Sequence, residues 1–529
     1  MRHLTWLLTA ALLGGFVGCQ SEDARFRQNM ALKRKVERTT MTGENGAPTE
    51  LSPQVTQQVA DVLAALFGTP DVPQLPIVEG IDNSQIADMK RLRMAAGRVS
   101  SDQDGRPHGL YREHCVHCHG ISGDGAGPTA AFLNPYPRDY RLGLYKFKST
   151  KVGEKPTHDD LKKILLNGIA GTAMPSFALL SDYEIEALID YVKYLSIRGE
   201  MERRLFTHAV EMEDPFDTMY GEYTTLVDKV TELERGGATG QVGDAQDRLY
   251  TALRNLRRIR PNLDEYQVEP SEEPVEPLDA TAAQQLATEV ADGLKALEAG
   301  LVAYQPPQLF STRTAEGTPR PDDEIKTQLA EFVGYAGEIM QKWIGQQSTP
   351  IPSPVEYDPQ GEVVQNDEGE PIEIQLDPND KQSLARGKAI FYGTVANCFS
   401  CHGESGLGDG QRDFYDAWSG EWVEKDKPEA TEEYVALGAL PPRNLIPRNL
   451  RSGVYRGGRR PIDLYWRITN GIDGAQMPAA PMLTESDPPG AKKLSQRDVW
   501  DLINYVQSLP YESISQPSEV QPQLAKEIH

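Results

Sequence analysis

The feature that most constrains this chain is an internal repeat built around two Cys-x-x-Cys-His pairs. Cys115-Val-His-Cys118-His119-Gly in the first half matches Cys398-Phe-Ser-Cys401-His402-Gly in the second. Four further blocks follow in the same order in both copies, and ordered self-similarity of this kind indicates a duplicated structural unit. These blocks are Gly123-Asp-Gly with Gly408-Asp-Gly, Pro137-Arg138 with Pro447-Arg448, Asn167-Gly168 to Met174-Pro175 with Asn470-Gly471 to Met477-Pro478, and Glu186–Leu195 with Trp500–Leu509.

A Cys-x-x-Cys pair by itself fits a zinc site, a redox dithiol or the attachment of a haem. The gap between Cys118 and Cys398 is too long for one zinc ribbon, and neither copy has further cysteines to complete a four-ligand site. A redox dithiol does not require a following histidine, yet one follows both pairs in a chain with only 9 histidines. We therefore predict two covalently bound haem c groups. Their attachment residues are Cys115, Cys118, Cys398 and Cys401, and their axial histidines are His119 and His402.

The second axial ligand of each iron is predicted to be a methionine. Methionine or a second histidine is the usual choice for electron transfer, and Met174 and Met477 occupy matched Met-Pro positions in the two copies. A methionine is more often a flexible core residue, but its repetition next to proline favours ligation. Met482 is the alternative ligand in the second copy. The unmatched His108 and His158 are weaker candidates for a bis-histidine site.

Taken together, these residues resemble the small mono-haem domains of bacterial class I c-type cytochromes, over residues ~100–198 and ~381–511. The resemblance implies a mainly α fold, with two cytochrome c-like domains on either side of a helical middle region. It implies a helix before each Cys pair, over 384–392 in the second copy and as a shorter segment over 109–112 in the first. It also implies a closing helix at 180–195 and 494–509. It also implies a proline carbonyl against the ring N–H of the axial histidine. Pro128 is the candidate in the first copy, and the second copy has no equivalent proline.

Two further pairs of matched residues are candidate haem contacts. Arg138 and Arg448 lie between the ligands in both copies, where an arginine can pair with a haem propionate. The alternative is that both are ordinary solvated surface residues. Tyr145 and Tyr455 are candidates for stacking on the edge of the porphyrin.

The N-terminus predicts export. A basic start, an apolar run from Leu4 to Val17 and a small residue at Gly18 are typical of a secretory signal over residues 1–18. Phe16-Val-Gly-Cys19 resembles a bacterial lipobox, which implies that Cys19 becomes lipidated and anchors the protein to a membrane. The alternative is an ordinary signal peptide with an incidental Cys19. No later segment is apolar for long enough to span a bilayer.

Composition and local pattern divide the remaining chain. The net charge of −24 argues against nucleic-acid binding and fits a soluble, exported protein that docks onto basic partners. Helical periodicity over 200–345 and Pro- and acid-rich breaks set the predicted boundaries. A loop is inserted in the second copy within roughly 411–446. The predicted segments are the signal peptide 1–18, a tether 19–84 with one helix over 52–67, the first cytochrome domain 85–198, a helical middle 199–346, a linker 347–380, the second cytochrome domain 381–511 and a tail 512–529.

These features predict an electron-transfer protein rather than a catalyst. Iron held by histidine and methionine has no open position, so each haem carries single electrons between redox partners of an extracytoplasmic respiratory chain. The protein acts either as a free periplasmic carrier or as a fixed subunit of a membrane complex. The alternative is a dihaem peroxidase-like enzyme in which one haem has an open or displaceable axial position. Two matched methionines weigh against that alternative.

Overall fold

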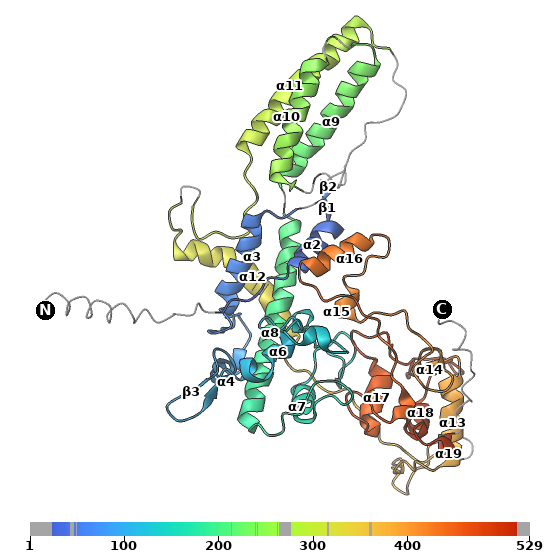
Figure 1. Ribbon diagram of the computed structural model, residues 1–529. Coiled ribbons are helices and arrows are strands. Elements are labelled where there is room, and N and C mark those ends of the chain that lie inside the picture. The colour runs from blue at the N-terminus through green and yellow to red at the C-terminus, as the bar shows by residue number, and fades with distance from the viewer. Residues whose placement is uncertain are drawn as a thin grey trace, which may run out of the picture.

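The computed structural model describes residues 24–42, 47–48, 50–212, 214–238, 240, 242–261, 263, 277–314, 317–358 and 362–515. This part of the chain is mainly α-helical, which confirms the predicted fold class (Figure 1). Within it, the strands form two short antiparallel ribbons, β1(Met41–Thr42) with β2(Ala47–Pro48) and β3(Ser100–Ser101) with β4(Pro107–His108). The predicted signal peptide and Cys19 lie outside the described residues, as does the tail beyond residue 515.

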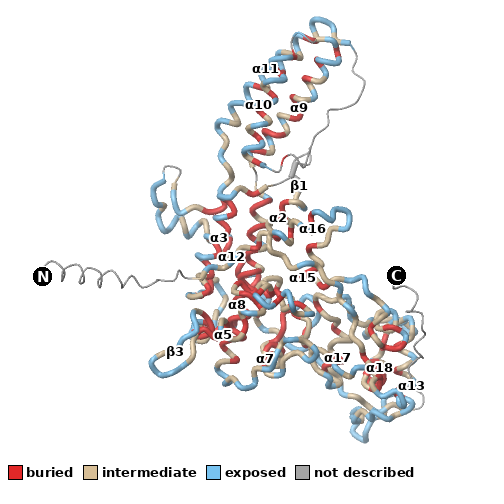
Figure 2. The backbone as a smooth tube through the Cα atoms, in the orientation of Figure 1, coloured by how far each residue is buried: buried red, intermediate tan, exposed pale blue. Residues whose placement is uncertain are grey.

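The first domain is organised around one 29-residue helix, α8(Asp182–Val210). A capping box starts this helix: the Ser181 side chain accepts from the backbone of Glu184, and the Glu184 carboxylate accepts from the backbone of Ser181. Its inner face is fully buried over several turns, as Figure 2 shows. The helix runs past the predicted domain end at residue 198. The other elements of this region are α4(Met89–Ala95), α5(Leu110–His114), α6(Val116–His119), η2(Asn83–Gln85), η3(Ala130–Phe132), η4(Tyr140–Leu142) and α7(His158–Asn167).

The helix that precedes the first Cys pair is divided in two. The sequence predicted only the short segment beginning at Gly109, which corresponds to α5. The longer part is α4, which packs on α8, and the β3–β4 hairpin separates the two pieces. The backbone N–H of Gly109 donates to the carbonyl of Met94 at 2.9 Å and closes this hairpin against the end of α4. An insertion of this kind interrupts the apolar periodicity on which a sequence-based prediction depends.

Residues 24–84 do not form the predicted tether. They contain two helices, α2(Met30–Thr39) and α3(Pro53–Phe67), and both pack against α8. Leu32, Val59 and Phe67 are fully buried in the core of the first domain. The buried Glu202 of α8 accepts the backbone N–H of Asn29 at 2.9 Å. This segment is therefore part of the first domain.

The middle region divides into two parts. The helices α9(Pro215–Arg235), α10(Gly243–Ile259) and α11(Ala280–Ala303) form a bundle with its own core, which projects away from the rest of the molecule (Figure 1). At one end of the bundle, the buried Arg260 pairs with Asp214 at 2.9 Å and Asp217 at 2.8 Å. The last helix, α12(Asp322–Gln341), returns to pack on α8 and α3.

The predicted linker 347–380 has structure of its own. Three isolated antiparallel bridges join Val355 with Glu373, Tyr357 with Val363, and Gln365 with Pro371. Ile351 and Leu376, from the same segment, pack against the core of the second domain. The linker is therefore docked on the domain that it precedes.

The second domain is built on the crossing of α13(Lys381–Tyr392) and α18(Gln496–Ser508), close to the predicted helices. Gly387 lies at the crossing, and only a residue without a Cβ leaves room for the carbonyl group of Asp501. The remaining helices are α14(Cys398–His402), α15(Ala417–Gly420), α16(Pro428–Ala436), η7(Leu450–Ser452), α17(Pro461–Asn470) and α19(Glu512–Ser515).

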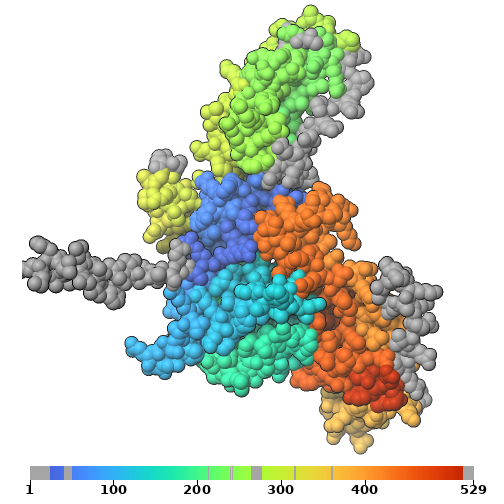
Figure 3. Space-filling view, in the orientation of Figure 1, coloured from blue at the N-terminus to red at the C-terminus, as the bar shows by residue number. Residues whose placement is uncertain are grey.

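The inserted loop of the second domain reaches across to the first. Its helix α16 packs on α2, where Glu433 pairs with Arg34 at 2.7 Å and with Arg38 at 2.6 Å. Figure 3 shows this orange segment in contact with the blue N-terminal part of the molecule. The loop also places Trp422 and Tyr434 in the core of the first domain.

The two repeated domains dock directly on one another. Lys148 of the first and Asp473 of the second form a buried ion pair at 2.6 Å, with side chains 3% and 5% exposed. The amide of Asn470 donates to the carbonyl of Ser149 at 3.0 Å. A second ion pair joins Lys163 to Asp463. Buried charged contacts are favourable only with good geometry, so the docking is specific.

None of the helices described here is long and apolar enough to cross a membrane.

Candidate haem-binding sites

The first Cys-x-x-Cys-His segment forms two short helical turns. Gly109 adopts a left-handed conformation at φ 78° and starts α5. Cys115 joins α5 to α6, and the backbone N–H of His119 donates to the carbonyl of Cys115 at 2.9 Å. This turn places both thiols and the imidazole on one side of the chain, and both cysteines are free of disulfides. The geometry suits attachment of one flat macrocycle beside the histidine.

A backbone carbonyl holds His119 by its Nδ1 atom. Nδ1 lies 3.0 Å from the carbonyl oxygen of Arg138, so Nε2 is the ring nitrogen that could bind a metal. In this structure the hydroxyl of Tyr140 lies 3.3 Å from Nε2. Burial lowers the pKa of His119 to about 4, so the imidazole is neutral, as a ligand must be. The acceptor is Arg138, and the expectation for Pro128 was wrong. The chain brings the Pro137-Arg138 segment back over the histidine, a tertiary contact that proline spacing alone does not reveal.

The second segment repeats this arrangement. Asn397 takes a left-handed conformation at φ 47° before α14. Nδ1 of His402 lies 3.0 Å from the carbonyl oxygen of Arg448, the residue that matches Arg138. Burial lowers the pKa of His402 as well. The repeated Pro-Arg block thus orients the histidine in both copies, a role that the sequence analysis did not assign to it.

The two predicted methionine ligands lie in loops of the same geometry. The carbonyl of Met174 accepts from Ile169 at 3.1 Å, and that of Met477 accepts from Ile472 at 3.0 Å. Each loop starts at a glycine with positive φ, Gly168 or Gly471, whose Cβ position is blocked by the loop backbone. Met482, the alternative, instead forms a bridge with Leu494 and packs on the domain core. The loop geometry therefore matches Met477, and not Met482, to Met174.

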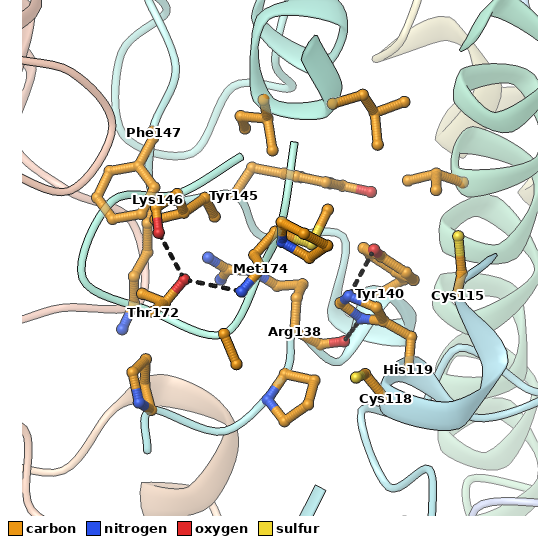
Figure 4. A pocket seen from close by; sticks show the side chains of 18 of the residues that line it. Cys115, Cys118, His119, Arg138, Tyr140, Tyr145, Lys146, Phe147, Thr172 and Met174 are labelled. Carbon is orange, nitrogen blue, oxygen red and sulfur yellow. Dashed lines mark hydrogen bonds between the residues drawn. The ribbon is translucent and has the colours of Figure 1, made fainter. Parts of the chain in front are cut away.

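A large cavity joins these groups in the first domain. Its lining includes Cys115, Cys118, His119, Tyr145 and Met174. The cavity together with its opening to solvent has a volume of about 1340 Å³. Figure 4 shows the Cys pair and His119 on one side, with Met174 near Arg138. Most of the lining is apolar, which suits a macrocycle.

The comparisons identify both regions. Residues 102–192 match the family model described as "Cytochrome C oxidase, cbb3-type, subunit III", and residues 384–510 match the model described as "Cytochrome c". The chain carries two cytochrome c domains. The matched ranges leave the helical bundle and α12 outside both models. A multi-haem c-type cytochrome that transfers electrons is the class that both matches support.

One solved structure is similar over much of the length. The reducing HAO-like protein complex of Kuenenia stuttgartiensis is 17% identical, with a TM-score of 0.33, and the match covers 78% of this chain and 99% of that one. At this TM-score nothing is inferred from the likeness. No curated protein matches the chain.

The residues of the first cytochrome c domain fit covalently bound haem c. Two free thiols, a neutral histidine whose Nε2 lies 3.3 Å from the Tyr140 hydroxyl, and a methionine line one apolar cavity. Tyr140 stacks on the His119 ring, with centroids 4.7 Å apart, and was not predicted. The residue that matches Tyr140 in the second domain is Leu450, so a comparison of the two copies could not single out Tyr140. Haem, where bound, supplies the redox-active iron.

The predicted tyrosine pair has a structural role that the sequence did not show. The hydroxyl of Tyr145 lies 2.7 Å from Ser196 on α8, and that of Tyr455 donates to the carbonyl of Val506 on α18 at 2.9 Å. Each tyrosine thus ties the loop between the ligands to the closing helix. Tyr145 also lines the cavity, as its predicted haem contact requires.

The predicted arginine pair differs between the domains. The Arg138 guanidinium lies over the ring of Trp418 at 4.3 Å and lines the cavity. Nε of Arg448 instead donates to the carbonyl of Val454 at 2.7 Å. Of the weaker candidates, His158 pairs with Glu186 at 2.9 Å, and His108 lies 3.9 Å from Asp102. Neither histidine lines the cavity.

Proposed function

We propose that this chain is a dihaem electron-transfer protein with one haem c in each cytochrome c domain. His119 and Met174 hold one iron, and His402 and Met477 hold the other. The observation that carries the proposal is the match between the two sites. In both, a carbonyl from the Pro-Arg block holds Nδ1 of the histidine, and in both a glycine-led loop presents the methionine. Two filled axial positions favour electron transfer over catalysis at iron.

The direct contact between the domains supports transfer of electrons within the chain. The ion pair of Lys148 with Asp473 and the hydrogen bond from Asn470 to Ser149 hold the two sites in one body. A spacer between independent domains would leave each haem to react alone. We therefore propose that an electron enters at one haem and leaves at the other.

Absorption spectra of the purified protein test the axial ligands. We expect two haems per chain and the weak far-red band of sulfur-ligated ferric haem. Met174→Ala and Met477→Ala should each remove about half of that band and lower one of the two midpoint potentials, because methionine ligation raises the potential. Met482→Ala is the matched control and should leave the band unchanged. A high-spin haem in the unmodified protein, with rapid cyanide binding, would favour the peroxidase-like alternative instead.

The proposed location is the outer side of a membrane, with the mature chain anchored through lipid on Cys19. The basic start, the apolar run and the lipobox-like sequence support this proposal. Cys19→Ser should move the protein from the membrane fraction to the periplasmic fraction with its haems still attached. Fractionation of the wild-type and Cys19→Ser proteins measures this. Equal distribution of both proteins would argue for an ordinary signal peptide.

The proposed partners are redox proteins with basic docking faces, either diffusing or fixed in a respiratory complex. The net charge of −24 supports this proposal, because opposite charge accelerates encounter. Electron-transfer rates with such a partner should fall as ionic strength rises. Rates that do not depend on salt would argue against electrostatic docking.

A further inference from the structure

The cavity of the first cytochrome c domain is partly built by the second. Two of its lining residues, Trp418 and Arg456, belong to the second domain. Trp418 lies on α15 in the inserted loop and is 6% exposed. Arg456 occupies the position in the repeat that Lys146 holds in the first domain, and Lys146 lines the same cavity. Residues from two domains thus meet around one site.

Several hydrogen-bond donors around this cavity have no acceptor. Among the described residues, Nη1 of Arg138, Nε of Arg456 and Nε1 of Trp418 are buried without a partner. All three groups are donors only. A buried donor without an acceptor costs about 1–3 kcal/mol, so their convergence indicates an acceptor that the protein itself does not supply.

The same cluster concentrates positive charge. The Arg138 guanidinium and the Lys146 ammonium lie over the ring of Trp418 at 4.3 and 4.2 Å. Burial, reinforced by the neighbouring Arg138, lowers the pKa of Lys146 to about 7. Of the nearby carboxylates, Asp473 pairs with Lys148 at 2.6 Å, and Asp416, whose charge acts on both Arg138 and Lys146, accepts from the backbone of Ser419 at 2.9 Å. The cations of this cluster outnumber the carboxylates beside them, and an excess of buried positive charge is unfavourable, so the missing acceptor is an anion.

We propose that Trp418 and Arg456 of the second domain, together with Arg138 and Lys146 of the first, hold the propionate carboxylates of the haem attached at Cys115 and Cys118. A carboxylate accepts hydrogen bonds and carries the required negative charge. The proposal rests on the proposed function, since it requires a haem at this Cys pair. It makes the second domain part of the first haem site.

The docking of the domains is close enough to fix these residues. A Cβ on Gly474, in the methionine loop of the second domain, would lie 3.1 Å from the Trp418 ring. A Cβ on Gly171, in the methionine loop of the first, would lie 3.2 Å from the Arg448 guanidinium. The methionine loop of the second domain thus packs on Trp418 of its own domain, and the methionine loop of the first contacts Arg448 across the interface. The second domain therefore influences the potential of the first haem through residues held in place.

A redox titration of the full chain with Arg456→Gln tests the proposal. Loss of a positive charge beside the propionates favours the ferric state. The ratio of reduced to oxidised first haem at a fixed potential should fall about tenfold, which is about 59 mV for one electron. Met174→His changes an axial ligand of the first haem, so the titration wave that it shifts is the wave of that haem. Arg138→Gln should shift the same wave in the same direction.

The control is Arg412→Gln, which removes the same charge from an exposed position in the same domain and should shift neither wave. The proposal is overturned if Arg456→Gln moves only the second haem, because Arg456 would then serve its own domain. It is equally overturned if neither wave moves in a variant with unchanged circular dichroism. Absence of haem at Cys115 and Cys118 in the unmodified protein would instead contradict the proposed function, so the two failures are distinguishable.

Discussion

Replacing Cys115 and Cys118 together with serine is expected to remove one of the two haems and leave the other attached. In the proposed function each thiol forms one of the covalent bonds to the macrocycle, so the double variant leaves only non-covalent contacts to retain it. The reduced haem spectrum in alkaline pyridine should fall to half per mole of protein. The mass of the mature chain should fall by one haem, apart from the mass of the substituted atoms.

The matched control is the same change at Cys398 and Cys401, which should also leave one haem. Spectra of the two variants should add up to that of the unmodified protein, apart from shifts caused by contact between the domains. Retention of both haems in either variant would contradict the assignment of these cysteines. Loss of both haems from one variant would show that one domain cannot assemble without the other, as their extensive docking permits.

Gly387→Ala is expected to destabilise the second cytochrome c domain by at least about 3 kcal/mol. Gly387 is at the crossing of α13 and α18, where a Cβ would overlap the carbonyl oxygen of Asp501 and lie 2.8 Å from Cβ of Tyr505. Neither obstacle is the flexible end of a side chain, so the two helices would have to separate. Urea unfolding followed by the Soret absorption of the Cys115→Ser, Cys118→Ser chain, whose remaining haem reports on the second domain, measures the loss.

Gly334→Ala is the matched control for this prediction. Gly334 lies within α12, is exposed, and has no heavy atom within 4 Å of its Cβ position. Alanine there should be neutral or stabilising by ~0.5–1 kcal/mol, because it restricts the unfolded chain and favours the helix. Equal unfolding midpoints for Gly387→Ala and the parent chain would show that the crossing tolerates a wider spacing.

Local sequence signals predicted much of the architecture. The resemblance placed α18 and the start of α8 to within a few residues, but α8 continues to Val210, past its expected end at 195. The starts are well defined because serine caps and apolar periodicity act over neighbouring turns. The same reasoning failed for α4, because the β3–β4 hairpin separates it from α5. In residues 24–84 it predicted the helix over 52–67, which is α3, but not α2 or the packing of both helices on α8, a distant part of the chain.

In the candidate sites too, local features could be predicted from the sequence, and contacts between distant residues could not. The sequence by itself determined the haem-attachment pattern and the matched Met-Pro loops, because attachment chemistry requires a fixed local spacing and the repeat doubles the signal. Only the tertiary structure decided that the carbonyls of Arg138 and Arg448 hold the histidines, and that Trp418 and Arg456 of the second domain line the first cavity. The histidine contacts depend on the fold of each domain, because they join residues 19 and 46 positions apart. The shared cavity lining exists because buried charges and apolar surfaces hold the two domains together.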